Sequence, residues 1–395
     1  MTRPISNCTL AKRNPPKIRS GILSNYWSTG MHKIDIDIAG DTCPVRVGHD
    51  ILGELGGQCR DLGLGRQVAL VSDEVVAERY LQPAAESLRA AGFQVLEVVY
   101  AGGEGSKNLQ GAEGIFTRLI EAEFDRGTWV AALGGGVVGD MSGFVASTYL
   151  RGIPCVQVPT TIVSQVDSSI GGKTGVNHAL GKNLIGAFFQ PRLVLIDTDV
   201  LRSLPRREVV AGMAEVVKHA LIRDEELFCF LEDRLDEVVA MELDAETLDW
   251  LIARNVGIKA AVVAEDEKEG GLRAILNYGH TIGHAIEAAT DYTRYKHGEA
   301  VILGLIGAGE IARREGLWPE EERRRQDALL ERLGVPEGLA EVGAERILER
   351  TKADKKRVDG RLRLILGRRV GEVEIVEGVE DDAVLSGIEY VQQRY

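Results

Sequence analysis

Five short apolar segments, each followed by a turn or a helical pattern, restrict the fold of residues 65–199 more than any other feature. In chain order they read GRQVALVSDEVV, FQVLEVVYAGGEGSKN, TWVAALGGGVVGDMSGFVAST, PCVQVPTT and RLVLIDTD. Strands that alternate with helices are typical of a parallel sheet with crossover helices. An earlier segment, HKIDIDIAG, alternates apolar and polar residues as a half-buried strand does. The sequence therefore predicts an α/β fold built on a parallel sheet.

The pattern changes after RSLPRRE at residues 202–208, because helical periodicity then continues to about residue 352. The segment GRLRLILGRRVGEVEIVEGV predicts a late hairpin, followed by a final helix. We therefore expect a Rossmann-like, NAD-binding type of α/β domain at 31–203 and a mainly helical domain at 204–395. Residues 1–30 carry five Lys or Arg and no acid, and they predict a flexible basic tail. Met31 is an alternative start of the chain.

Composition narrows the class of partner. A formal net charge of -13 argues against a general binder of nucleic acid or membrane surfaces, but it leaves room for a local basic cluster that holds an anionic small molecule. No apolar run reaches the roughly 18 residues that a membrane span needs. The five cysteines are scattered and form no C-x-x-C pair, which favours reduced thiols and a cytoplasmic location.

Two glycine-rich segments follow predicted strands. LGGGVVGD contains G-x-G-x-x-G at Gly134, Gly136 and Gly139, and such a turn lets the backbone approach a pyrophosphate at a helix start. No acidic residue stands roughly 20 positions on, as a standard ribose site would have. The turn is therefore equally compatible with tight packing. In GGEGSKN, Glu104 and Lys107 could contact a ribose and a phosphate, or form an ordinary loop.

Basic side chains gather among glycines in VDSSIGGKTGVN and GKNLIGAF. Lys173, Lys182 and Asn183 lie there with Asp167, and lysine beside glycine suits contacts to phosphate or carboxylate. The combination favours a binding site over a solvated loop.

Histidines concentrate in NYGHTIGHAIEAATDYTRYKHGEAV, which holds three of the seven in the chain. His280 and His284 share one helix face, and His297 follows a loop later. Imidazoles at this spacing favour a divalent-metal or catalytic site over a structural one. A further ligand is expected from GMAEVVKHAL, where spacing alone does not choose between Glu215 and His219.

Long segments of the chain resemble the 3-dehydroquinate synthase family, in order from about residue 31 to the C-terminus. They are GGGVVGDMSGFVASTYLRG, QVPTTIVSQVDSSIGGKTGVNHALGKNLIGAFFQP, LPRREVVAGMAEVVKHALI, EGGLRAILNYGHTIGHAIE and HGEAV. The resemblance implies NAD, a divalent metal that is usually zinc with cobalt as a substitute, and a cytoplasmic homodimer. It also implies a small-molecule sugar phosphate substrate, 3-deoxy-D-arabino-heptulosonate 7-phosphate. NAD would oxidise a hydroxyl transiently, phosphate would leave, and re-reduction, ring opening and an aldol step would give 3-dehydroquinate.

The resemblance also implies roles for individual residues. The metal ligands would be Glu215, His280 and His297, with His284 moving protons. The implied substrate contacts are Lys173, Asn183, Lys218, Lys259, Arg273, Asn277 and one of Lys355 and Lys356, of which we favour Lys356, with Arg151 reaching into the partner's site. The implied NAD contacts are Asp73, Gly102, Gly103, Glu104, Gly105, Ser106, Lys107, Gly136, Val137, Val138, Gly139, Asp140, Thr160, Thr161, Asp167, Lys173, Lys182, Val200, Leu201, Arg202 and Ser203.

Three alternatives remain at this point. A catalytically idle regulatory or binding relative should lack a metal ligand or His284, and none of these residues is missing here. A related sugar phosphate cyclase would share the GGGV turn and the metal residues, although VDSSIGGK and GKNLIGAF resemble the dehydroquinate branch more closely. A metal-dependent polyol dehydrogenase would share the fold, but it would produce NADH and would not need the cationic cluster.

Overall fold

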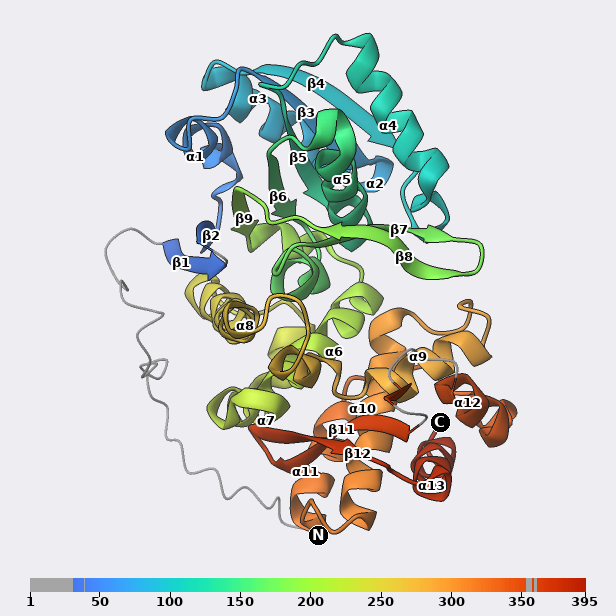
Figure 1. Ribbon diagram of the computed structural model, residues 1–395. Helices are drawn as coiled ribbons and strands as arrows, with labels where there is room; N and C mark the ends of the chain where they lie inside the picture. The colour runs from blue at the N-terminus through green and yellow to red at the C-terminus, as the bar shows by residue number, and fades with distance from the viewer. Residues whose placement is uncertain (1–30, 39, 353–356, 359–360) are drawn as a thin grey trace.

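A seven-stranded sheet forms the upper layer of the molecule in the computed structural model, which describes residues 31–38, 40–352, 357–358 and 361–395 (Figure 1). The strands lie in the order β1-β2-β9-β6-β5-β3-β4. Their bounds are β1 Met31–Ile38, β2 Asp41–Gly48, β3 Gln67–Asp73, β4 Gln94–Tyr100, β5 Trp129–Gly134, β6 Cys155–Pro159 and β9 Leu193–Asp197. The five apolar segments of the sequence are β3, β4, β5, β6 and β9, all parallel, so the predicted α/β fold is confirmed.

The first strand differs from the expected parallel arrangement. β1 pairs antiparallel with β2, because the chain turns back at Gly40, whose φ is 96°. β2 was not predicted, since Pro44 interrupts its pattern and proline usually argues against a strand inside a sheet. The sheet is therefore parallel except at this edge.

Alternate residues of the strands cover the two faces of the sheet. Val68 and Leu70 of β3 pack in a cluster with α1 and α3, whereas Ala69 and Val71 pack with α4 and α5. The helix bounds are α1 Leu55–Asp61, α3 Gln82–Ala90, α4 Leu109–Glu121 and α5 Gly136–Thr148. Continuous apolar runs in these strands follow from burial on both faces.

A separate two-stranded hairpin, β7 Lys173–His178 and β8 Gly181–Phe188, extends from the sheet layer above the helical layer (Figure 1). It carries the lysine-rich and glycine-rich segments of the sequence. Their many glycines gave no strand signal, because glycine is depleted in strands. The hairpin packs against α5 and contacts helix α9 (His280–Ala289) through Lys182 and Glu287.

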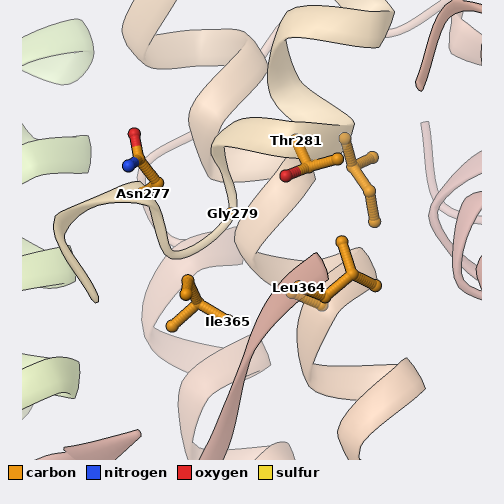
Figure 2. Close-up of a pocket in the computed structure, with 7 residues that line it drawn as sticks. Asn277, Gly279, Thr281, Leu364 and Ile365 are labelled. Atoms are coloured by element: carbon orange, nitrogen blue, oxygen red, sulfur yellow. The ribbon is translucent and has the colours of Figure 1, made fainter. Parts of the chain in front are cut away.

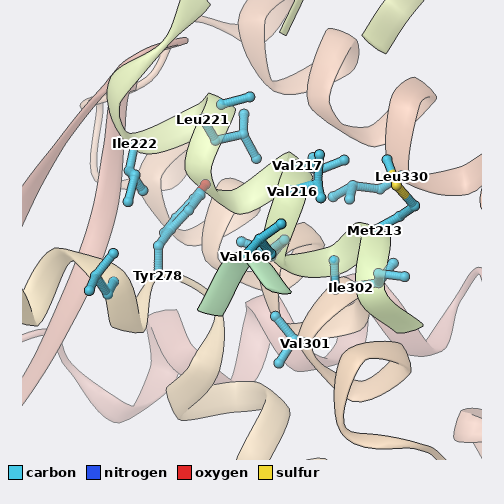
Figure 3. Close-up of a cluster of buried hydrophobic side chains, with 14 of the residues drawn as sticks. Val166, Met213, Val216, Val217, Leu221, Ile222, Tyr278, Val301, Ile302 and Leu330 are labelled. Carbon is cyan, nitrogen blue, oxygen red and sulfur yellow. The ribbon is translucent and has the colours of Figure 1, made fainter. Parts of the chain in front are cut away.

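Helices form the lower layer, as the sequence predicts. Their bounds are α6 Arg206–Arg223, α7 Glu225–Val239, α8 Ala245–Glu265, α9 His280–Ala289, α10 His297–Arg314, α11 Glu320–Glu331, α12 Ala344–Lys352 and α13 Asp381–Gln392. A small sheet of β10 Arg357–Val358, β11 Arg361–Arg369 and β12 Glu372–Glu377 contains the predicted late hairpin. Figure 3 shows the core of this layer, where Met213 and Val217 of α6 meet Ile302 of α10. Within the described ranges, no helix has both the length and the apolar character to cross a membrane.

Helix α8 joins the two layers. Ile34, Ile36 and Val45 of the β1–β2 hairpin belong to the same buried cluster as Trp250 and Leu251 of α8. The first hairpin of the chain is therefore packed against the helical layer as well as against the sheet.

Candidate active site

The carboxyl ends of the parallel strands bring the predicted NAD contacts to one edge of the sheet. Asp73 ends β3, residues 102–107 follow β4, residues 136–140 follow β5, and Thr160 follows β6. The chain passes from β3 to β4 on one side and to β5 on the other, so strand order reverses between β3 and β5. Ligands of open α/β sheets bind at the carboxyl edge of such a reversal.

The glycine-rich turn serves both packing and ligand access. A Cβ on Gly134 would lie 2.4 Å from Val138 Cγ2, and one on Gly139 would lie 2.7 Å from Gln157 Oε1. These two glycines are therefore required by the close approach of α5 to its strands. No side chain caps the start of α5 at Gly136, so its first N–H groups are available to an anion.

Lys107 is buried and bridges three segments. Its Nζ donates to Asp140 Oδ2 at 2.6 Å and to Asn183 Oδ1 at 2.7 Å. Burial raises the pKa of Asp140 in spite of the neighbouring ammonium of Lys107. In this arrangement Lys107 fixes the hairpin and the loop after β4 against α5.

Glu215 of α6 is fully buried with one carboxylate oxygen unsatisfied. Oε2 accepts a hydrogen bond from Lys218, whereas the buried Oε1 has no hydrogen-bond partner in the described chain. Oε1 lies 3.5 Å from His280 Nε2 and 3.8 Å from His297 Nε2. Burying an unpartnered carboxylate oxygen is unfavourable, and a bound cation would satisfy it. The donor set of one carboxylate and two imidazoles fits zinc or a similar divalent ion.

The geometry also brings His284 to the same place. Ligand atoms of His280, His284 and His297 lie within 4.8 Å of one another, and the ring centroids are 5.4 to 5.6 Å apart. The distances alone therefore do not choose between Glu215 and His284 as the third ligand.

His219, the alternative ligand left open by the spacing in α6, is fully buried next to Glu215. It forms a second close group with Glu215 and Asp167, within 4.8 Å. Burial and the charge of Lys218 lower the pKa of His219 to about 3, so its ring is neutral at physiological pH. Its Nδ1 lies 3.2 Å from Asn255 Oδ1, which orients the ring.

Each of the two imidazoles that face Glu215 has a polar partner at its other ring nitrogen, Nδ1. His280 Nδ1 lies 3.1 Å from the carbonyl oxygen of Tyr278. His297 Nδ1 lies 3.0 Å from Glu287 Oε2. Burial disfavours protonation of His297, but the hydrogen bond and charge of Glu287 outweigh it and raise its pKa. Both rings direct Nε2 toward Glu215, as in metal sites whose histidines are oriented by outer partners.

Several of the predicted cationic residues lie where the sheet layer and the helical layer meet. Lys259 Nζ lies 2.6 Å from Asp167 Oδ1. Lys173 Nζ and Asn277 Nδ2 donate to the two oxygens of Glu269, at 2.5 and 2.7 Å. Glu269 was missed by the sequence analysis, and its only signal was an acid directly before the Gly-Gly pair.

Arg273 lies in the same region and is almost completely buried. Its guanidinium donates to the carbonyl oxygens of Gly171, at 3.1 Å, and of Glu267. It therefore joins the start of the β7–β8 hairpin to the loop before α9.

Two predicted positions among the described residues, Arg202 and Arg151, lie apart from this group. The guanidinium of Arg202 donates to the carbonyl oxygens of Met241 and Leu243, at 2.9 and 3.1 Å, and so connects the layers. Arg151 is exposed, and its φ of 72° is left-handed, which is strained for a residue with a side chain. Lys355 and Lys356 lie outside the described residues.

A small cavity lies beside the turn that carries His280, but it is not the substrate site. Figure 2 shows it between Asn277, Thr281 and the β11 residues Leu364 and Ile365. Its volume of about 10 Å³ is close to the space of a single water. Ligand pockets are far larger, roughly 300 Å³ or more.

Comparison with known proteins gives matches over most of the chain. The model of the 3-dehydroquinate synthase N-terminal region matches residues 97–211, and that of the C-terminal region matches residues 212–357. The 3-dehydroquinate synthase of Nostoc punctiforme is 47% identical over 354 residues, covering 89% of this chain and 97% of that protein. The enzyme of Microcystis aeruginosa is 48% identical over 328 residues, covering 83% and 90%.

Solved structures with the same fold include sugar phosphate cyclases. A 2-deoxy-scyllo-inosose synthase with carbaglucose-6-phosphate, NAD⁺ and Co²⁺ has a TM-score of 0.81 at 30% identity, covering 90% of this chain and 99% of that one. The 2-epi-5-epi-valiolone synthase of Streptomyces hygroscopicus, with NAD⁺ and Zn²⁺, has a TM-score of 0.82 at 26% identity, covering 91% and 99%. A glycerol dehydrogenase from Schizosaccharomyces pombe, at 17% identity and a TM-score of 0.62, shares the fold alone.

Proposed function

The chain belongs to the 3-dehydroquinate synthase family, and we propose that its reaction takes place between Glu215, His280 and His297 and the carboxyl edge of the sheet. It is a lyase that acts on a phosphate ester and converts 3-deoxy-D-arabino-heptulosonate 7-phosphate into 3-dehydroquinate and phosphate. This step belongs to the shikimate pathway of aromatic biosynthesis. The observation that carries the proposed location is the unsatisfied Oε1 of Glu215 beside two Nε2 atoms.

Glu215, His280 and His297 would hold the divalent ion, for which we propose zinc with cobalt as a functional substitute. NAD would bind at the strand ends, near residues 102–107 and 136–140. When bound, the metal supplies polarisation of substrate oxygens, and NAD supplies a reversible acceptor for one hydride. The glycine turn before α5 supports this location, since its free N–H groups suit a pyrophosphate.

The anionic groups of the substrate would be held by the cationic side chains that lie where the two layers meet. Lys173 and Asn277 already share one carboxylate, Glu269, so their donors converge on one position. A substrate phosphate or carboxylate would replace such internal acceptors. The remaining substrate contacts that we propose are Asn183, Lys218, Lys259, Arg273 and Lys356.

His284 would transfer protons during elimination and ring closure. Its ring lies one helical turn beyond His280, with centroids 5.4 Å apart. An imidazole is suited to this role because its ordinary pKa is near neutrality.

We also propose a cytoplasmic homodimer with domains at 31–203 and 204–395. The exposed, left-handed Arg151 supports a contact outside its own subunit, because strained residues concentrate at functional positions. Arg151 of each subunit would then complete the site of its partner.

Phosphate release from 3-deoxy-D-arabino-heptulosonate 7-phosphate tests this function. The purified chain is assayed with and without NAD and with a chelator. Release that requires NAD, stops on chelation and leaves no net NADH supports the proposed site. Absence of release by the protein loaded with metal and NAD would contradict it. Other sugar phosphates, and polyols with NADH as the readout, would then distinguish a related cyclase from a dehydrogenase.

A further inference from the structure

Glu287 is a buried carboxylate that none of the proposed roles uses. It lies on α9 at 4% exposure, close to one turn beyond His284. Its Oε2 lies 3.0 Å from His297 Nδ1, and its Oε1 lies 3.4 Å from Lys182 Nζ. One side chain therefore contacts both a proposed metal ligand and a lysine of the β7–β8 hairpin.

Glu287 is buried between two groups that can donate hydrogen bonds to it, the ring of His297 and the ammonium of Lys182. A buried carboxylate without such partners would be strongly unfavourable. These two contacts therefore account for the presence of a carboxylate at this buried position.

The contact to Nδ1 decides which nitrogen of His297 faces the metal position. Since a neutral imidazole carries one N–H, a carboxylate that accepts from Nδ1 leaves the lone pair on Nε2. Nε2 is the atom that lies 3.8 Å from Glu215 Oε1. His280 has a neutral partner in the same role, the carbonyl of Tyr278. Glu287 differs because its partner group is a carboxylate. A carboxylate at Nδ1 raises the basicity of Nε2, the nitrogen that would bind the metal.

The contact to Lys182 connects Glu287 to the sheet layer as well as to His297. Lys182 stands on the hairpin of the sheet layer and also lies 4.2 Å over the ring of Tyr292. The hairpin is thus tied to α9 at the point where the metal ligand is oriented.

We propose that Glu287 is a positioning residue that fixes the orientation and tautomer of His297 and couples the metal site to the β7–β8 hairpin through Lys182. The inference rests on the proposed role of His297 as a ligand. Loss of the carboxylate would weaken metal binding and free the hairpin.

Metal affinity of Glu287→Ala and Glu287→Gln tests the first half. Co²⁺ binding is followed by visible absorption in competition with a chelator. Glu287→Ala should bind Co²⁺ about 10- to 100-fold more weakly with an altered spectrum, the range typical of lost outer partners. Glu287→Gln should lose less, because its amide oxygen still accepts from Nδ1–H. Should Glu287→Ala fail to fold, Glu287→Gln carries the test.

Glu310→Gln is the matched control. Glu310 is a similarly buried glutamate of α10, but it pairs with Arg313 and Arg314. Its variant should bind Co²⁺ as the unmodified protein does. Unchanged affinity in both Glu287 variants, or an equal loss in Glu310→Gln, would overturn the inference.

His297→Ala separates this inference from the proposed ligand set. If His297→Ala binds Co²⁺ normally, the ligand assignment itself fails. If His297→Ala loses the metal while the Glu287 variants keep it, only the positioning role fails.

Amide hydrogen exchange over residues 173–188 tests the link to the hairpin. Exchange there should be faster in Glu287→Ala and unchanged in Glu310→Gln. Equal exchange in Glu287→Ala and the unmodified protein would show that Glu287 does not couple the metal site to the β7–β8 hairpin.

Discussion

The sheet layer and the helical layer meet along two seams of opposite chemistry. The first, the α8 seam, is mainly apolar, since Ile34, Ile36 and Val45 pack in one buried cluster with α8. The second, the ion-pair seam, is formed by ion pairs, among them Lys173–Glu269 and Lys182–Glu287. The same two layers are thus joined by burial on one side and by charge on the other.

The difference indicates which seam can exchange its partners. Buried apolar surface stabilises by roughly 25 cal/mol per Å² and gains nothing from a ligand. Partly exposed ion pairs contribute only about 0 to 1 kcal/mol each, so an anionic ligand can replace one partner at little expense in stability. The α8 seam therefore holds the layers together, and binding and chemistry are expected at the ion-pair seam.

Removal of a proposed metal ligand should have the largest effect on activity. Glu215→Gln should lower kcat/KM by at least about 10³-fold, because several kcal/mol of charge stabilisation depend on the metal. The assay is phosphate release at saturating NAD and metal. Activity within tenfold of the unmodified protein would show that the reaction does not depend on a metal held by Glu215.

Truncation in the α8 seam should instead affect stability. Ile36→Ala should lower the free energy of unfolding by about 2 to 4 kcal/mol, as buried isoleucines do when they leave a cavity. Urea denaturation measures this loss, and Ile36→Val is the control, with an expected loss of about 1 kcal/mol. A large fall in kcat/KM of the folded Ile36→Ala protein would show that this seam also takes part in binding.

Substitution of a lysine in the ion-pair seam should instead affect substrate binding and leave stability nearly unchanged. Lys173→Met should raise the KM for substrate at least about tenfold, since a charged hydrogen bond to an anion is worth roughly 1.5 to 3 kcal/mol. Unfolding should change by less than about 0.5 kcal/mol, because Lys173 and Glu269 are 50% and 30% exposed. Lys33→Met, at an exposed lysine of β1, is the control. A stability loss as large as that of Ile36→Ala would erase the distinction between the seams.

The smallest effect is expected at a polar contact within the α8 seam. His49 Nδ1 lies 2.8 Å from Asp249 Oδ2 of α8, and this hydrogen bond raises the pKa of His49. A raised histidine pKa stabilises the fold below the unfolded value of about 6.5, and this contribution disappears as the pH rises through the folded pKa. His49→Gln should therefore cost under about 1 kcal/mol at pH 5.5 and less at pH 8.5, since the ring is 39% exposed. An equal loss at both pH values in urea denaturation would exclude a charged His49.

The sequence predicted those elements whose signals are local. Apolar runs identified β3, β4, β5, β6 and β9 because both faces of a parallel sheet are buried. β2 was not predicted because Pro44 interrupts its strand pattern. The β7–β8 hairpin was not predicted because several glycines weaken its strand pattern.

In the candidate site, too, only the residues with a local sequence signal could be predicted. His280 and His284 could be recognised from a four-residue spacing, and His297 from its nearness in the chain. Glu269 and Glu287 could not be assigned, because their roles depend on partners brought to them by the fold. The third metal ligand also stays undecided by distance, since both Glu215 and His284 lie near the other two histidines.

Co²⁺ binding by Glu215→Gln and His284→Asn tests the central claim most directly. The account predicts that Glu215→Gln loses high-affinity Co²⁺ binding, whereas His284→Asn binds Co²⁺ normally and releases phosphate slowly. Loss of Co²⁺ by His284→Asn with normal binding by Glu215→Gln would contradict it. The metal would then be held by three histidines, and Glu215 would need another role.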